Sequence, residues 1–265
     1  MNSVDLTALD LAIAASLIVL DAVMSLAFGL RVHRQLVIAA LRMVVQLLLV
    51  GLVLRWLFAS GSVAMTLAVI VLMVAAAARE VAVRPKQRLH RLGNYRIAAI
   101  VVAASSVATV LLALTTAIRP NPWHDPRYAI PLMGIVLGSV LNSASIALDS
   151  FMGDVSGARS KIEARLALGS PLQTALAPLM SDALRKGMIP VINQMSAAGI
   201  ITLPGIMTGQ LLAGMDPMSA VKYQILLLFL LAGSSGLASG GAVYLASRSV
   251  GDERDRLRLD HFASR

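Results

Sequence analysis

The chain has 265 residues, of which 57% are apolar and only 14% charged, and its net charge is +9. This composition, with a mean hydropathy of +0.78, excludes a soluble globule with a polar surface and indicates a membrane protein with several spans. Because cysteine is absent, disulfides, thiolate metal sites and a thiol nucleophile are excluded as well. The positive charge lies in loops between apolar segments, so no nucleic-acid partner is expected.

Seven segments are long and apolar enough to cross a bilayer, which takes about 20 residues of helix. They are residues 6–30, 36–58, 60–78, 97–118, 128–148, 188–212 and 221–246. We therefore expect an all-α helical bundle with about seven transmembrane helices, forming a single transmembrane domain over residues 1–265. The first segment is too long for the core of a signal peptide and is expected to be a retained helix.

Basic residues gather in alternate loops. The loops after the first, third, fifth and seventh segments hold most of them, whereas the other loops hold only Arg119 and Arg127, with Lys222 at the edge of a segment. Since positively charged loops stay on the cytoplasmic side, the N-terminus is predicted outside and the C-terminus in the cytosol. Basic loops on this side also attract anionic membrane lipid.

Several polar residues lie inside the apolar segments at a similar depth. With a rise of about 1.5 Å per residue, Asp21 and Arg42 lie roughly 13 and 9 Å from the cytosolic boundary and Gln46 about 15 Å. Charged groups in hydrocarbon rarely face lipid, so Asp21 and Arg42 are expected either to pair with each other or to contact a substrate.

Amide side chains occur at the same depth on later segments. Asn142, Asn193 and Gln194, together with Ser143, either line a polar cavity or cross-link helices through hydrogen bonds. Both interpretations fit their positions.

The segment at residues 188–212 has the length of a span but contains Pro190, two amides and a break at Pro204-Gly205. In a bilayer, such a segment is tolerated mainly where neighbouring helices or a water-filled cavity satisfy the freed backbone groups. This pattern is typical of a transport path. The candidate substrate-path residues are Asp21, Arg42, Gln46, Asn142, Ser143, Asn193, Gln194, Pro204, Gly205 and Gln210.

Residues 149–187 are too polar to cross the membrane and are expected to form two short helices on the cytosolic surface. The first, around residues 158–168, ends at Gly169, which suits a left-handed C-terminal cap. Glu163 and Ala164, followed by Gly169, reproduce the opening of the loop with which bacterial ATP-binding cassette permeases contact their ATPases. The remainder of that pattern does not follow.

The second helix is predicted to begin with Ser170 as N-cap, Pro171 at the first helical position and Gln173 closing a capping box. It should bend near Pro178 and end at residues 186–187. Such a helix pair can transmit the closure of an ATPase as a rigid-body push. The alternative is an amphipathic hairpin on the membrane surface without a partner. The candidate coupling residues are Glu163, Ala164, Gly169, Ser170 and Pro171.

Three stretches together resemble the FetB family of permease subunits, which includes bacterial iron exporters and plant aluminium-tolerance membrane subunits. They are residues 130–142, 163–169 and 187–214, and the most distinctive part is Leu-Pro-Gly-Ile-Met-Thr-Gly-Gln at 203–210. The resemblance implies a homodimer of permeases in a bacterial inner membrane, bound to a separate ATP-binding cassette ATPase and exporting a substrate, usually iron.

The chain contains no Gly-x-x-x-x-Gly-Lys-Ser/Thr loop, so it is not expected to hydrolyse ATP itself. We expect a transport subunit that is not an enzyme, with no cofactor of its own and with ATP bound by the partner. The alternative is an ion-coupled secondary transporter that uses Asp21 and Arg42, although such carriers often contain inverted repeats and none is evident. Metal ligands and the cargo stay open, with iron, another metal, a chelate and an organic anion all compatible.

Overall fold

The computed structural model describes residues 7–29, 32–60, 62–85, 87–89, 93–122, 124–252, 256–258 and 262–264. The first expected segment therefore has its two end residues, 6 and 30, outside the described part. The chain divides into two units, Met1–Gly61 and Ser62–Arg265, which are taken separately below. The described residues are almost entirely helical, which confirms the all-α prediction.

Six described helical segments are long and apolar enough to cross a membrane, which confirms a multi-pass membrane protein. Five of the seven expected segments correspond to one such helix each. A sixth, the expected segment at 97–118, corresponds to an α-helix that continues into a π-helix. The segment at residues 188–212 is different, as described below. The orientation of the two termini stays a prediction.

Unit 1 contains two helices, α1 (Ala8–Ala27) and α2 (His33–Ser60). The N-terminus of α1 is a capping box, because the Thr7 N–H donates to the Asp10 carboxylate at 2.8 Å and the Asp10 N–H donates to the Thr7 hydroxyl at 3.4 Å. The Ser25 hydroxyl accepts the N–H groups of Val32 and His33, each at 3.0 Å, and so ties the start of α2 to α1. Most apolar side chains of both helices are exposed, as lipid-facing helices require.

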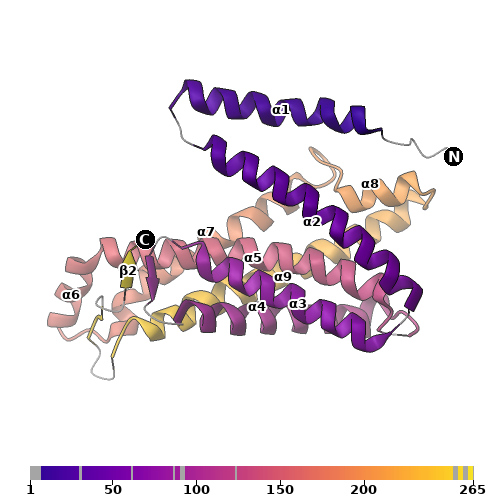
Figure 1. Ribbon diagram of the computed structural model, residues 1–265. Coiled ribbons are helices and arrows are strands. Elements are labelled where there is room, and N and C mark those ends of the chain that lie inside the picture. Colours follow the sequence, from indigo (N-terminus) through magenta and orange to yellow (C-terminus); the bar gives the residue numbers. More distant parts are fainter. Residues whose placement is uncertain are drawn as a thin grey trace. The chain divides into compact units, whose positions relative to one another are not determined.

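Unit 2 is a helical bundle in which α5, α7 and α9 pack against one another and α3 and α4 cover α5 (Figure 1). Its core includes Val140, Leu148 and Phe151 on α5 and Leu176 on α7, all fully buried. A short antiparallel ribbon pairs the segment after α3 with the C-terminal segment. The elements are α3 (Val63–Val83), β1 (Gln87–Leu89), α4 (Gly93–Leu112), η1 (Ala113–Ile118), α5 (Pro126–Gly157), α6 (Arg159–Ala167), α7 (Leu172–Ala197), α8 (Gly205–Leu212), α9 (Pro217–Ser249) and β2 (Phe262–Ser264).

The short helix α6 ends as predicted. Gly169 has a φ of +86°, and its N–H donates to the Leu166 carbonyl at 2.9 Å, while the Ser170 N–H donates to the Arg165 carbonyl at 3.1 Å. A residue with a side chain is strained at this φ, which is why glycine suits the position. The predicted capping box of the next helix is wrong, because the N-cap of α7 is Pro171 and no side chain caps it.

The largest departure from the sequence prediction is α7. It was expected to end at residues 186–187, before a separate span at 188–212, but it continues through Pro178 and Pro190 to Ala197. Proline removes one hydrogen bond from a helix, yet packing on both sides can hold the helix together. Because α7 packs against both α5 and α9, this packing overrides the local signal. The chain then turns at residues 198–204 and forms α8.

The helix α5 is also longer than expected, because it continues past residue 148 to Gly157. The polar segment 149–187 therefore consists of the end of α5, the whole of α6 and the first part of α7. Figure 1 shows α6 at one end of unit 2 and α8 at the other, with α7 running between them.

Candidate functional site

A polar cavity of about 210 Å³ lies between α5, α7 and α9. On α5 the lining side chains recur at the spacing of one helix face, and on α7 they lie within little more than one turn. The lining residues are Ile135, Ser139, Asn142, Ser143, Pro190, Val191, Gln194 and Leu231.

The polar cavity contains three of the candidate residues that the sequence suggested. Asn142 and Ser143 lie on α5 and Gln194 lies on α7. Asn142 and Gln194 are exposed, whereas Ser143 is buried. Asn193, the neighbour of Gln194, is exposed and is not among the lining residues. Contact of these groups with a substrate stays a prediction.

Two polar contacts extend the cavity to residues that sequence reasoning did not single out. Ser139 and Ser235 share a hydrogen bond of 2.8 Å between their hydroxyl groups, which links α5 to α9. Arg84, at the C-terminal cap of α3, donates from Nη1 to the Oδ1 atom of Asn142 at 3.5 Å. In the sequence Arg84 is one of several basic residues in a loop, and only the path of α3 brings it to the cavity.

Close packing holds α7 against both neighbours one turn before the cavity. A Cβ atom on Gly187 would lie 2.6 Å from the Ser239 hydroxyl, 2.9 Å from the Ala147 Cβ and 2.9 Å from the Ser143 carbonyl oxygen. Only glycine fits a contact of this kind, because the carbonyl belongs to the backbone and cannot move aside. Sequence reasoning did not identify this position as a close helix contact, because its partners lie on α5 and α9, far away in the sequence.

The remaining unit 2 candidates lie beyond the end of α7. Pro204 is the N-cap of α8, and Gly205 is its first residue. In the turn before α8, the Gly199 N–H donates to the Thr202 carbonyl at 2.9 Å. Gln210 on α8 has a buried Oε1 atom without a hydrogen-bond partner among the described residues. These residues are not part of the cavity lining.

Three further candidates belong to unit 1. Asp21 lies on α1, and Arg42 and Gln46 lie on α2. All three are exposed within their unit. The pairing of Asp21 with Arg42 and their role in a substrate path stay predictions.

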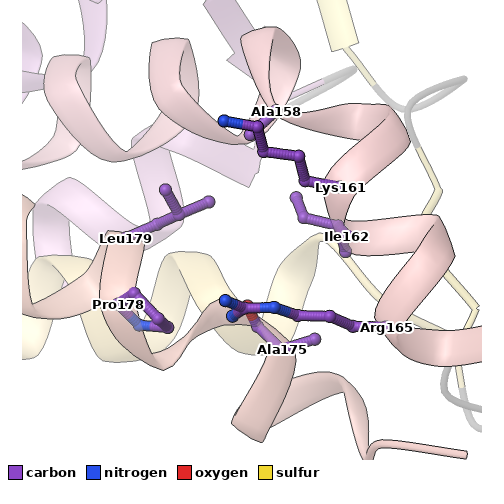
Figure 2. Close-up of a pocket in the computed structure, with 7 residues that line it drawn as sticks. All are labelled: Ala158, Lys161, Ile162, Arg165, Ala175, Pro178 and Leu179. Atoms are coloured by element: carbon purple, nitrogen blue, oxygen red, sulfur yellow. The ribbon is translucent and has the colours of Figure 1, made fainter. Parts of the chain in front are cut away.

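A second pocket, of about 80 Å³, lies between α6 and α7 (Figure 2). Figure 2 shows the Arg165 side chain extending from α6 towards α7, where its Nη1 donates to the Ala175 carbonyl at 3.3 Å. This bond ties the two helices into a unit, which we call the α6–α7 hairpin (residues 159–179). The pocket is lined by Ala158, Lys161, Ile162, Arg165, Ala175, Pro178 and Leu179.

The candidate coupling residues lie on the α6–α7 hairpin but outside its pocket. Glu163, Ala164, Gly169 and Pro171 are exposed, and Ser170 is half-buried. The Glu163 carboxylate accepts a hydrogen bond from Nε of Arg159, one turn earlier, at 2.8 Å. These side chains are therefore available to another chain.

An ion-pair cluster joins α5 to α7 near the hairpin. Lys186 Nζ lies 2.7 Å from Asp182 and 3.1 Å from Asp154, and Asp154 also accepts a hydrogen bond from Ser150. The hydrogen bonds to Asp182 and then to Asp154 raise the pKa of Lys186 above its ordinary value. From the sequence this lysine was expected to end a helix, and its acidic partner on α5 was not recognised.

The described residues contain no group of three or more His, Cys, Asp or Glu side chains placed to hold a metal ion. The polar cavity is lined by hydroxyl, amide and aliphatic groups. Amide and hydroxyl oxygens alone are weak ligands for transition metals. The sequence left the metal ligands open, and the described residues therefore provide no candidate set of them.

Comparison with known proteins gives a consistent set of relatives. The model of the family described as "Uncharacterised protein family (UPF0014)" matches residues 8–250. The chain is 36% identical over 203 residues to the UPF0014 membrane protein slr1647 of Synechocystis, covering 77% of this chain and 78% of the relative. It is 31% identical over 234 residues to the UPF0014 membrane protein STAR2 of Oryza sativa, covering 88% and 80%.

A further relative has a functional name. The chain is 28% identical over 257 residues to the "Probable iron export permease protein FetB" of Escherichia coli, and the match covers 97% of each protein. No solved structure matches the chain.

Proposed function

Because the chain belongs to the UPF0014 family of membrane proteins, we propose that it is the permease subunit of an exporter driven by a separate ATP-binding cassette ATPase. The similarity to FetB of Escherichia coli, which is named a probable iron export permease, supports transport as the function and iron as part of the cargo. Iron is then a substrate, and ATP is bound by the partner.

The observation that carries this proposal is the continuity of α7. Its first turns include Pro178 and Leu179, which line the hairpin pocket, and its later turns include Pro190 and Gln194, which line the polar cavity. These two regions are about 18 Å apart along one helix axis. A rigid helix transmits a displacement over this distance, so a push on the α6–α7 hairpin would move the wall of the cavity.

The α6–α7 hairpin has the properties expected of a docking site for the ATPase. The basic loops favour the cytosolic side for it, where ATP is available. Glu163, Ala164 and Gly169 present an exposed edge. The hairpin carries the exposed basic side chains of Lys161 and Arg165, so an acidic surface on the ATPase would complement it.

A homodimer completes the proposed transporter. Asn142 and Gln194 are exposed in unit 2, and amide groups at bilayer depth rarely face lipid because lipid offers them no hydrogen-bond partner. A second permease copy would cover these groups and place the cargo path between the two polar cavities.

A crosslinking experiment tests the docking part of this proposal. Since the chain contains no cysteine, the Ala164→Cys variant carries a single thiol on α6. With a short thiol–amine crosslinker in membranes that contain the ATPase, we expect a crosslinked product of the two chains. Thr202→Cys, in the turn before α8, is the matched control and should give none. A product from Thr202→Cys alone would place the ATPase at the wrong end of α7 and refute the proposal.

A further inference from the structure

The polar cavity is richer in groups that bind an anion than in groups that bind a metal cation. We propose that it binds an anionic, carboxylate-bearing ligand, free or as a metal chelate, with Arg84 as the counter-charge. Transport of this ligand rests on the proposed function, whereas its binding in the polar cavity does not. The inference narrows the substrate class to negatively charged carboxylates, either free or in complex with iron or another metal.

The position of Arg84 carries the first step. Its guanidinium contacts Asn142, which lines the cavity, at 3.5 Å, and it reaches there from the end of α3. A guanidinium is always charged and its planar N–H groups match a carboxylate in geometry. A positive charge beside the cavity attracts an anion and repels a bare metal ion.

The amide groups carry the second step. Asn142 accepts the Arg84 hydrogen bond through Oδ1, so its NH₂ group is left with two N–H donors. Gln194 supplies a second amide on the opposite wall, from α7. Carboxylate oxygens are acceptors without donors, and they therefore complement N–H groups from both walls.

The acidic residues nearby carry the third step. The lining itself contains no carboxylate. On α5, Asp149 lies two turns beyond Asn142 and is not part of the lining, and Asp154 and Asp182 are held by Lys186. Metal cations in proteins prefer carboxylate, imidazole or thiolate ligands, and the cavity offers none of them.

Binding measurements on the purified full-length chain in lipid nanodiscs test this proposal without the ATPase. Citrate, ferric citrate and ferrous ion are titrated separately by isothermal titration calorimetry. We expect the wild type to bind ferric citrate or citrate more tightly than ferrous ion. Binding of citrate alone identifies the free carboxylate as the recognised group, and binding of ferric citrate alone identifies the chelate.

Charge substitutions then locate the site. Arg84→Gln should weaken binding of the anion by about tenfold or more, since it removes one charge-assisted hydrogen bond, and Arg84→Lys should retain most of it. Arg79→Gln, which removes an exposed arginine of α3 that pairs with Glu80, is the matched control and should bind as the wild type. Gln194→Glu keeps the shape of the side chain but adds a negative charge, so it should weaken anion binding even if Arg84 variants fold poorly.

Two results would overturn the inference. One is tighter binding of ferrous ion than of both anions by the wild type. The other is anion binding that neither Arg84→Gln nor Gln194→Glu weakens. Because no ATPase is present in these measurements, neither result would contradict ATP-driven transport. A failure of ATP-driven transport would likewise not contradict the binding data.

Discussion

Gly187 on α7 faces Ser239 on α9 so closely that a Cβ atom on the glycine would lie 2.6 Å from the serine hydroxyl oxygen. The same Cβ would lie 2.9 Å from the Ser143 carbonyl oxygen of α5. The three central helices of unit 2 therefore meet at one glycine, next to the polar cavity.

The first prediction concerns this contact. Gly187→Ala should lower the free energy of unfolding by about 1–3 kcal/mol, because an added methyl group overpacks a rigid site. The measurement is the thermal unfolding midpoint of the purified protein in detergent. Gly153→Ala, at an exposed site of α5 with no atom within 4 Å of its added Cβ, should leave the midpoint unchanged or raise it. Equal midpoints for Gly187→Ala and the wild type would contradict the close contact.

The second prediction concerns the ion-pair cluster between α5 and α7. Lys186→Met should reduce the free energy of unfolding by less than about 1 kcal/mol, since partly exposed ion pairs contribute little. Arg159→Met removes an ion pair within α6 and is the control for an exposed pair that does not join two long helices.

The pH dependence of this effect has a definite sign. The pKa of Lys186 is raised above the ordinary value of 10.5 by its two aspartates, so the charged lysine is favoured in the folded protein. Its contribution is complete below pH 10.5 and is lost as the pH rises through the raised pKa. The difference in unfolding midpoint between the wild type and Lys186→Met should therefore shrink above that pKa. A difference that grows with pH in this range would contradict the assignment.

The third prediction concerns the coupling residues. Glu163→Ala should uncouple ATP hydrolysis from transport while the protein still inserts and folds, because its exposed carboxylate is bonded to Arg159 one turn earlier and contributes little to stability. Transport and ATPase rates are measured together in proteoliposomes. If the role of Glu163 were only to stabilise α6, Arg159→Met would uncouple the two rates to the same extent, and that result would contradict a docking role.

Gly169→Ala provides an independent test of the same end of the hairpin. The added Cβ is strained at a φ of +86°, which costs about 1 kcal/mol and loosens the turn between α6 and α7. We expect reduced coupling with near-normal amounts of protein in the membrane. Wild-type coupling in both Glu163→Ala and Gly169→Ala would place the ATPase contact elsewhere.

The fourth prediction concerns orientation. In the cysteine-free chain, Ser170→Cys should react with an impermeant thiol reagent only when the cytosolic side is accessible. Thr202→Cys should react only from the outside, because α7 separates the two positions. Labelling of intact cells and of inside-out vesicles measures both. The opposite pattern would reverse the orientation, and labelling of both from one side would contradict a crossing of the membrane between these two positions.

The parts of the fold that depend on local chemistry were predictable from the sequence. The end of α6 at Gly169 follows from the glycine after an amphipathic stretch, and the long apolar helices follow from length and hydropathy. The helical rise placed Asn142 and Asn193 at a common depth, and the structure has Asn142 and Gln194, the neighbour of Asn193, in the lining of one cavity. In these cases, neighbouring residues contain the relevant information.

The parts that depend on tertiary packing were not predictable. Pro190 was placed near the start of a separate span at 188–212, but packing keeps α7 helical on both sides of it. Gly187 and Arg84 act through residues far away in the sequence, namely Ser239 and Asn142, so spacing rules along one helix could not identify them.

The most direct test of the proposed function is transport by purified protein in liposomes, with and without the proposed ATPase partner. We predict that iron, supplied as ferric citrate, moves across the membrane only when this ATPase and hydrolysable ATP are both present. Movement driven by a proton gradient alone, without the ATPase or ATP, would contradict the proposal and identify the chain as an ion-coupled secondary transporter.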